Sequence, residues 1–249
     1  LWIFKPRSME AFYVTGLPGA LALSRIDGTA TQVGLLGFNL LCRVPNGAFF
    51  VGSDGRAYLL DAGVSAVTTP PVQTAISGSR PVACMYYEDR GHGFCCITFR
   101  DCPAWCYDLT TGEWHERASG AGPWTVAGTA MLDGQWPAAR STGDIMRMAR
   151  TNSDGADDLI RTAISATMEN DGQRFTLAEV EIFARTGDAS GVNVSLTLSG
   201  DYGRTFGPER LRQMPDAGAY GQRVMWRGLG QFRNATARIQ ITAPVDVTM

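Results

Sequence analysis

The string "SGDYGRTFG" is the stretch whose residue types and spacing most invite a chemical interpretation. It contains Ser199, Asp201, Gly203, Thr205 and Phe206. A carboxylate at this place can accept backbone N–H groups across a turn, and a glycine permits a positive φ. The serine and threonine hydroxyls can bond within the same turn. Because all of these roles are local and none is catalytic, the residues predict a structural turn between two strands.

The same pattern is the Asp-box of sialidase-type β-propellers, so a glycan-cleaving enzyme is the alternative interpretation. Such an enzyme needs an arginine cluster for a carboxylate, an acid/base residue and a Tyr–Glu nucleophile pair, and the spacing nominates none of them. The carboxylates most open to a functional interpretation are Asp154, Asp157 and Asp158, in a polar stretch that we expect to be a solvated loop able at most to hold a cation. We therefore predict no catalytic residue, no resident metal and no cofactor.

Six cysteines raise the question of a zinc site. They are Cys42, Cys84, Cys95, Cys96, Cys102 and Cys106. Cys102 and Cys106 are spaced more widely than a C-x-x-C pair, and the chain has two histidines, so a Cys/His zinc site is the alternative interpretation. Strand alternation along "GFCCITF" would point Cys95 and Cys96 to opposite faces. We interpret the six as buried free thiols in a reducing compartment.

No other catalytic motif is present: the chain lacks a G-x-S-x-G elbow, a P-loop and a His-Glu-x-x-His pattern. His115 has charged neighbours in "EWHER" but no nucleophile at a recognisable spacing, so we expect a hydrogen-bonding residue at the edge of a sheet. The six tryptophans are expected to fill the core and the spaces between sheets.

Short apolar or alternating runs bounded by Gly, Asp, Asn and Pro dominate the chain, and helical periodicity is almost absent. The expected strands cover residues 11–16, 21–27, 47–52, 56–62, 93–99, 104–109 and 144–149, and then 159–168, 176–185, 192–200, 221–230 and 235–244. In the first set, a strand, a tight turn and an aromatic strand recur at irregular intervals of about 35–50 residues, which favours propeller blades. In the second set, alternation such as Val192-Val194-Leu196-Leu198 is typical of half-buried sandwich strands.

We therefore predict an all-β protein in two parts. Residues 1–154 are expected to form propeller-like β blades, and residues 155–249 an antiparallel β-sandwich, with the boundary in the polar stretch 151–158. A blade needs a neighbour on each side to bury both of its faces. Because few such units are recognisable and the chain does not begin with Met, we expect an incomplete ring that is the later part of a longer protein.

The composition is that of a globular protein with a low charge density. The chain has 249 residues, 18% of them charged, with a net charge of −2 and a pI of about 5.7. This balance gives no overall electrostatic case for nucleic-acid binding. No apolar run reaches the roughly 18–20 residues that span a bilayer, and the first residues do not have the pattern of a signal peptide.

Several segments in a fixed order resemble one family, the packaged-DNA stabilisation proteins of short-tailed phages, also called tail accessory, hub or nozzle proteins. They are "LWIFKPRSMEAFYVTG", "AFFVGSDGRAYLL", "DRGHGFCCITFRDCPAWCYDLTTGEWHERAS" and the C-terminal "LSGDYGRTFGPER" with "GAYGQRVMWRGLGQFRNATARIQIT". The third segment is the most similar and matches through His92, Phe94, Tyr107, Asp108, Gly112, Trp114, Glu116 and Arg117. The first half of the family's sequence has no counterpart here, and "FRDCPAW" carries cysteines where the family has a Pro/Thr pattern.

The resemblance implies a virion protein of the short tail, assembled in the host cytoplasm, with no enzymatic activity and no membrane partner. It implies a ring of identical subunits, expected to be a hexamer, below the portal and its adaptor or head-completion protein. This ring would lengthen the DNA channel, help to retain the packaged DNA and hold a tail needle, tailspike or fibre. Double-stranded DNA would pass without sequence-specific binding, and a mildly negative wall would let it pass freely.

Two other functions stay open: a carbohydrate-active or glycan-binding Asp-box propeller protein, and a propeller interaction module of a larger protein. The residues that we expect to matter for assembly or packing lie in "YDLTTGEWHER" and in the aromatic–glycine loop before residue 226. They are Tyr107, Asp108, Trp114, His115, Glu116, Arg117, Tyr220, Arg223 and Trp226.

Overall fold

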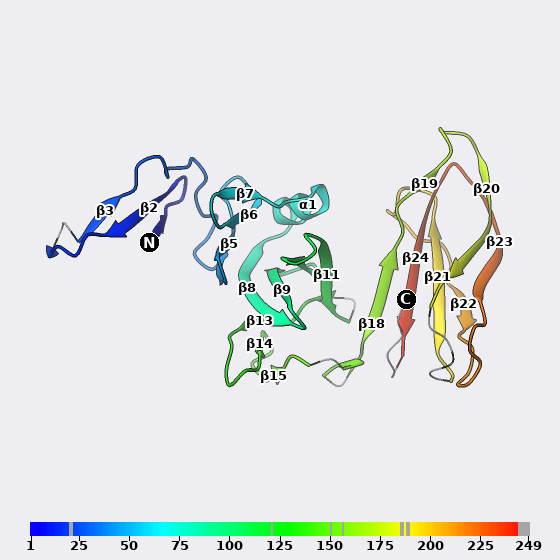
Figure 1. The fold of residues 1–249 in the computed structure, drawn as a ribbon. Helices are drawn as coiled ribbons and strands as arrows, with labels where there is room; N and C mark the ends of the chain where they lie inside the picture. Colours follow the sequence, from blue (N-terminus) through cyan, green and yellow to red (C-terminus); the bar gives the residue numbers. More distant parts are fainter. Residues whose placement is uncertain are drawn as a thin grey trace. The chain divides into compact units, whose positions relative to one another are not determined.

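The computed structural model describes residues 1–19, 22–120, 122–149, 151–155, 157–184, 187 and 190–243. It divides into two compact units, Leu1–Ala149 and Arg150–Met249. The boundary expected at residues 154 and 155 stays a prediction. Nearly all regular structure is β, and the C-terminal unit is a β-sandwich, so the all-β class is confirmed (Figure 1). A propeller ring stays a prediction.

In the described part of the first unit, four antiparallel sheets follow one another along the chain. Their strands are β1 (Trp2–Phe4), β2 (Met9–Val14) and β3 (Leu23–Arg25); β4 (Leu41–Val44), β5 (Gly47–Val51), β6 (Ala57–Leu60) and β7 (Val64–Ala66); β8 (Pro81–Asp89), β9 (His92–Phe99), β10 (Ala104–Asp108), β11 (Trp114–Ser119) and β12 (Gly122–Pro123); and β13 (Val126–Thr129), β14 (Pro137–Arg140) and β15 (Ile145–Arg147).

These sheets pack face to face in chain order, because each inner sheet is apolar on both faces. Met9 of β2 and Phe50 of β5 are buried between the first and second sheets. Phe49, the neighbour of Phe50 on the strand, points the other way into the core between the second and third sheets. A third core, with Val126, separates the third and fourth sheets. Alternation along a strand therefore supplies two cores from one sheet.

One helix occurs among the described residues, α1 (Pro70–Gly78), which the sequence did not predict. Its prolines occupy the first helical positions, where the missing N–H would have no intrahelical partner. Val72 and Ile76, one helical turn apart, are buried in the core between the second and third sheets. No helix in the described part of the chain is long and apolar enough to cross a membrane.

The second unit begins with a small hairpin and continues as the sandwich. Its strands are β16 (Ser153–Asp154), β17 (Asp157–Asp158), β18 (Ile160–Ile164), β19 (Met168–Glu169), β20 (Phe175–Ile182), β21 (Asn193–Ser199), β22 (Arg210–Gln213), β23 (Val224–Phe232) and β24 (Asn234–Thr242). One sheet has the order β18-β24-β21-β22, with β19 also paired to β24, and the other contains β20 and β23 (Figure 1). The core between them includes Leu196, Trp226 and Ile241.

Two expectations about polar and thiol residues are corrected. The acidic stretch expected to be a solvated loop includes the β16–β17 hairpin, in which Asp154 pairs with Asp157 along the ladder. Cys96 and Cys106 are joined by a disulfide across neighbouring strands β9 and β10, with their Cα atoms 4.0 Å apart, so the free-thiol interpretation is wrong for this pair. The other four cysteines are free, and of these Cys84 and Cys95 are buried as expected, whereas Cys42 and Cys102 are only half-buried. The predicted opposite orientation of Cys95 and Cys96 is confirmed, because they lie in different cores.

Candidate functional site

The segment "YDLTTGEWHER" forms β10, a turn and β11, and its side chains alternate between the two faces of the third sheet. His115 and Arg117 point toward the fourth sheet, on the same face as Asp108. Tyr107 and Trp114 point toward the second sheet. Glu116 lies between His115 and Arg117 on β11, is paired with Trp105 across the ladder, and is exposed. The sheet therefore separates the predicted assembly residues into two groups, and their role in assembly stays a prediction.

His92 and Asp108 form the most catalytic-looking pair. His92 Nδ1 lies 2.7 Å from Asp108 Oδ2, and the Thr110 N–H donates to Asp108 Oδ1 at 2.8 Å. Burial alone would raise the pKa of the Asp108 carboxyl, but the hydrogen bonds from Thr110 and His92 outweigh burial and lower it. In the described part of the chain no hydroxyl or thiol hydrogen-bonds to the other His92 nitrogen. The pair therefore lacks the nucleophile of a triad.

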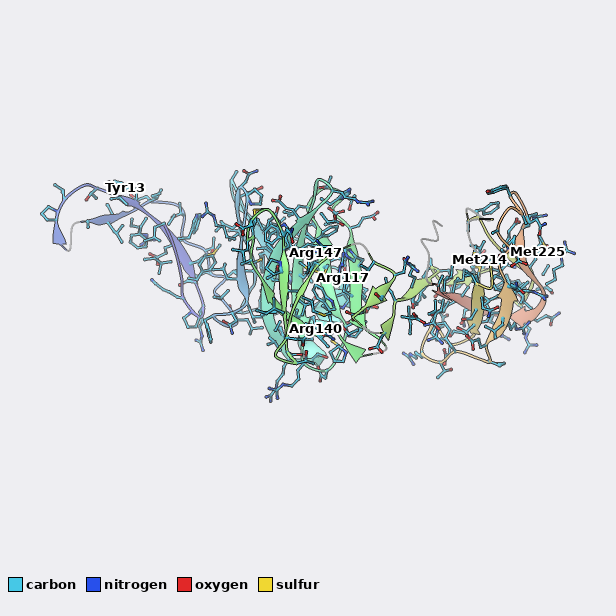
Figure 2. The ribbon with its side chains drawn as sticks, turned by 90° about the horizontal axis from the view of Figure 1, so that it is seen from below. Tyr13, Arg117, Arg140, Arg147, Met214 and Met225 are labelled. Carbon is cyan, nitrogen blue, oxygen red and sulfur yellow. A yellow bond between two sulfur atoms is a disulfide. The ribbon has the colours of Figure 1, made fainter. Side chains whose placement is uncertain are left out.

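Arg117 lies in an aromatic box that sequence reasoning did not find. Figure 2 labels Arg117 within the first unit. Its guanidinium carbon is 5.3 Å from the Tyr87 ring centroid, 5.4 Å from that of Phe94 and 5.8 Å from that of Trp124. The three rings come from β8, β9 and the segment after β12. Because these segments are separate in the sequence, no local sequence pattern predicts the arrangement. Cation–π attraction holds the arginine across three elements, which is a structural role.

His115 completes this cluster as a neutral acceptor. Its Nε2 accepts a hydrogen bond from Arg117 Nε at 3.2 Å, and its ring packs edge-on against Phe94. Burial and, next, the positive charge of Arg117 lower the pKa of His115 to about 4. The expected hydrogen-bonding role of this histidine fits that geometry.

We expect acid to destabilise the first unit through His115. Its folded pKa lies below the unfolded value of 6.5, so its contribution is present above about pH 6.5 and is lost as the pH falls toward 4. The expected loss is about 2 kcal/mol, after allowance for solvent at the half-buried ring. Urea unfolding at pH 7 and pH 4 measures it. His115→Gln keeps a hydrogen-bond acceptor without this titration, so an equal loss in wild type and His115→Gln would contradict the assignment.

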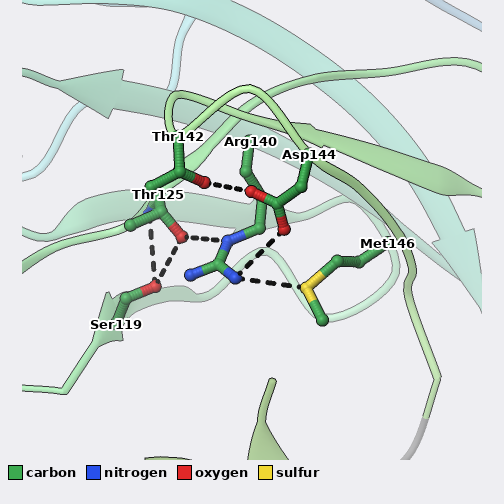
Figure 3. A network of polar contacts seen from close by, with 6 residues as sticks. All are labelled: Ser119, Thr125, Arg140, Thr142, Asp144 and Met146. Carbon is green, nitrogen blue, oxygen red and sulfur yellow. Dashed lines mark hydrogen bonds and ion pairs between the residues drawn. The ribbon is translucent and has the colours of Figure 1, made fainter. Parts of the chain in front are cut away.

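Arg140 organises a second polar network, on the fourth sheet. Its Nε donates to Thr125 Oγ1 at 2.9 Å, and its Nη1 lies 3.4 Å from Asp144 Oδ2 and 3.2 Å from Met146 Sδ (Figure 3). Thr125 in turn meets Ser119 of β11, with 3.0 Å between the hydroxyl oxygens. The network connects the fourth sheet to the third. The Arg140 guanidinium is engaged in contacts with Thr125, Asp144 and Met146.

Trp114 joins the third sheet to the second from the opposite face. Its Nε1 donates to the Val67 carbonyl at 2.7 Å, just beyond β7. Its ring lies 5.1 Å from Tyr107 and 6.2 Å from Phe49, measured between centroids. Phe49 belongs to β5, so the tryptophan connects two sheets by packing and by a hydrogen bond.

The Asp-box forms a self-contained turn after β21. Ser199 Oγ donates to Asp201 Oδ1 at 2.6 Å and accepts the Gly203 N–H at 2.9 Å. Thr205 donates twice to Asp201, from its N–H at 2.8 Å and from its hydroxyl at 2.6 Å. The hydrogen bonds from Ser199 and Thr205 hold the pKa of Asp201 well below its usual range. Gly203 has φ +80°, as a turn glycine requires.

The segment that follows the Asp-box turn folds back over the outer face of β21, where Phe206 and Gly207 hold it in place. The Arg238 guanidinium lies 4.1 Å from the Phe206 ring centroid, and Arg238 Nε donates to Thr197 Oγ1 at 3.1 Å. The Gly207 N–H donates to the Leu198 carbonyl at 2.9 Å. Both Asp201 oxygens bond within the turn, so the geometry favours the structural interpretation of the Asp-box over a catalytic one.

The three C-terminal candidates lie in different environments. Trp226 is 3% exposed, and its Nε1 donates to the Arg210 carbonyl at 2.9 Å. Arg223 forms a two-point ion pair with Glu181 of β20. The Tyr220 side chain is 71% exposed. The structure thus gives Trp226 a core position, whereas Tyr220 and Arg223 are at the surface.

A glycosidase active site contains a pair of carboxylates, and the lining of neither of the following two hollows provides such a pair. The first, of about 320 Å³, is lined by Pro45, Tyr86, Glu88, Gly91, His92, Gly93, Leu109 and Thr110. Its one carboxylate, Glu88, accepts a hydrogen bond from the Tyr86 hydroxyl at 2.7 Å. The second hollow, beside β23, is lined by three arginines and no carboxylate. No group of three or more His, Cys, Asp or Glu side chains in the described ranges is arranged to hold a metal.

Residues 161–249 match the family model described as bacteriophage P22 Gp10, β-sandwich. The matched residues run from β18 through the sandwich. The match covers less than half of the chain, and it supports a tail or hub-type structural protein of a short-tailed phage, which is a virion component.

Solved structures give weak similarities. An exo-β-1,3-galactanase from Phanerochaete chrysosporium, solved with β-1,3-galactotriose, is 10% identical over 96% of this chain and 77% of its own, with a TM-score of 0.34. A glycoside hydrolase is 11% identical over 80% of this chain and 68% of its own, with a TM-score of 0.18. Similarities at this level carry no argument about function. No curated protein sequence matches the chain.

Proposed function

We propose that this chain is the hub, or nozzle, protein of a short phage tail. In this role it lies below the portal and adaptor, lengthens the DNA channel, helps to retain packaged DNA and anchors a tail needle or spikes. The observation that carries the proposal is the match of residues 161–249 to the P22 Gp10 β-sandwich model. The sequence segments of the first unit that resemble the tail hub family support it.

The build of the first unit supports a mechanical role. Its two inner sheets are buried on both faces, and its arginine networks connect one sheet to the next. Such packing resists deformation, since close-packed interiors have low compressibility. A channel wall that holds DNA under pressure requires this property more than it requires a reactive group.

The partners in this proposal are identical subunits, arranged as a ring that we expect to be a hexamer, the adaptor above and the needle or spikes below. Flat β faces repeated around an axis suit a heterologous contact that closes on itself. DNA passes through the ring without sequence-specific binding, in keeping with the chain's net charge of −2. Glycan hydrolysis, the alternative function, is not supported by the lining of either hollow.

Immunogold labelling of particles from the source, imaged by electron microscopy, tests the proposal. We expect label at the short tail, just below the portal vertex, and none after the antibody has been absorbed with the recombinant chain. Particles without label, with the protein free or on cell surfaces, would overturn it.

A further inference from the structure

Among the described residues of the second unit, strand β23 has a free edge. It pairs with β20 on one side, and the sheet that contains them has these two strands. No strand in the described part of the chain is hydrogen-bonded to the other side of β23. A free edge presents unpaired N–H and C=O groups, which form a template for an added strand.

A hollow of about 350 Å³ runs beside this edge. It is lined by Arg212 and Gln213 of β22, by Val224, Met225 and Arg227 of β23, and by Arg223 just before β23. The hollow thus lies between β23 and β22, the last strand of the facing sheet. The Arg223 and Arg227 side chains are 58% and 70% exposed, so the hollow is open to solvent.

The lining of the hollow is positively charged. Arg223 pairs with Glu181, and Arg227 Nε lies 3.5 Å from Glu179 Oε2, so these two charges are partly balanced from β20. Arg212 is exposed and forms no ion pair with any residue that the structure describes. Gln213 of the lining donates to the Asp216 carboxylate at 3.2 Å, so Arg212 is the guanidinium of the lining that has no ion pair among the described residues. Guanidinium groups bind carboxylates in paired hydrogen bonds.

Alternation along β23 arranges these groups for a strand-like ligand. Val224 and Trp226 point into the core, so Arg223, Met225 and Arg227 share the outer face of the sheet. A strand added to the edge would place every second side chain on that same face, with carboxylates opposite Arg223 and Arg227. The other strand of this sheet, β20, carries Glu179 and Glu181, so its edge does not favour an acidic ligand.

We propose that the free edge of β23 binds an extended acidic segment of a partner protein as an added β-strand. Main-chain hydrogen bonds supply the pairing, and the arginines select carboxylate side chains. This inference does not depend on the proposed tail function.

The test uses the whole chain and a fluorescein-labelled peptide of four Glu-Val repeats, with binding followed by fluorescence anisotropy at low salt. We expect the acidic peptide to bind and a Lys-Val peptide of the same length not to bind. N-methylation of every second peptide amide should abolish binding, because it removes the strand hydrogen bonds. Saturating peptide should protect from hydrogen exchange every second amide of Val224–Arg227, namely those that point away from β20 toward the free edge.

Arg212→Glu should weaken peptide binding about fivefold, since an attraction is replaced by a repulsion at an exposed site. Arg204→Glu is the matched control: it makes the same charge change in the exposed Asp-box turn, away from the hollow, and should leave the affinity unchanged. The peptide controls need no variant, so they decide the matter even if Arg212→Glu does not fold.

Three results would overturn the proposal. Equal binding of the N-methylated peptide would mean attachment by charge alone. Equal binding of the Lys-Val peptide would mean that the arginines select nothing. If a short double-stranded DNA bound in place of the peptide, and Arg212→Glu weakened that binding, the hollow would be a phosphate-binding site.

Discussion

Replacing Trp226 with alanine is expected to lower the free energy of unfolding of the sandwich by about 4 kcal/mol. The ring is 3% exposed and packs in the core between the two sheets, so truncation leaves a large cavity. The change also removes the Nε1 hydrogen bond to the Arg210 carbonyl. Guanidinium unfolding followed by far-UV circular dichroism measures the loss.

Two further variants separate the causes. Trp226→Phe keeps an aromatic ring but lacks the indole donor, and should cost about 2 kcal/mol. Tyr220→Ala is the matched control, because Tyr220 is 71% exposed, and should change the stability by no more than about 0.5 kcal/mol. If Trp226→Ala and Tyr220→Ala had equal effects, the indole would not be a core residue.

The sandwich strands were largely predictable, because their signal is local alternation. The expected strand at 192–200 is observed as β21, and Val192, Val194, Leu196 and Leu198 all lie in the core. The expectation of a half-buried strand was wrong, since Ser195 on the other face is buried as well. The Asp-box turn and Arg238 cover that face, and a fold-back of this kind depends on contacts that the strand's own sequence does not contain.

The features that the sequence did not predict depend on strand register or on contacts between residues that are far apart in the chain. Strand β8 is nine residues long but has an irregular start at Pro81, with a register shift between Pro81 and Ala83, so alternation did not identify it. The disulfide requires that Cys96 and Cys106 face each other across β9 and β10, and the ladder register decides this. The aromatic box of Arg117 and the hollow at β23 likewise bring together residues from separate strands.

Replacing Trp114 with alanine is expected to cost about 3 kcal/mol in the first unit, somewhat less than a fully buried tryptophan because the ring is half-buried. The indole is packed against Tyr107 and Phe49 and donates to the Val67 carbonyl at 2.7 Å. Its loss removes packing and a hydrogen bond between the second and third sheets at once. Thermal melting and hydrogen exchange of β5 and β10 measure the effect.

The matched variants divide this effect into its parts. Trp114→Phe keeps a ring against Phe49 and loses the donor to Val67, so it should cost about 1 kcal/mol. Phe38→Ala removes a ring that is 86% exposed and should leave the melting midpoint unchanged. Since Trp114 links neighbouring sheets, its loss should speed exchange in β5 as well as in β10. Faster exchange confined to β10 and β11 would show that the two sheets are held together without this residue.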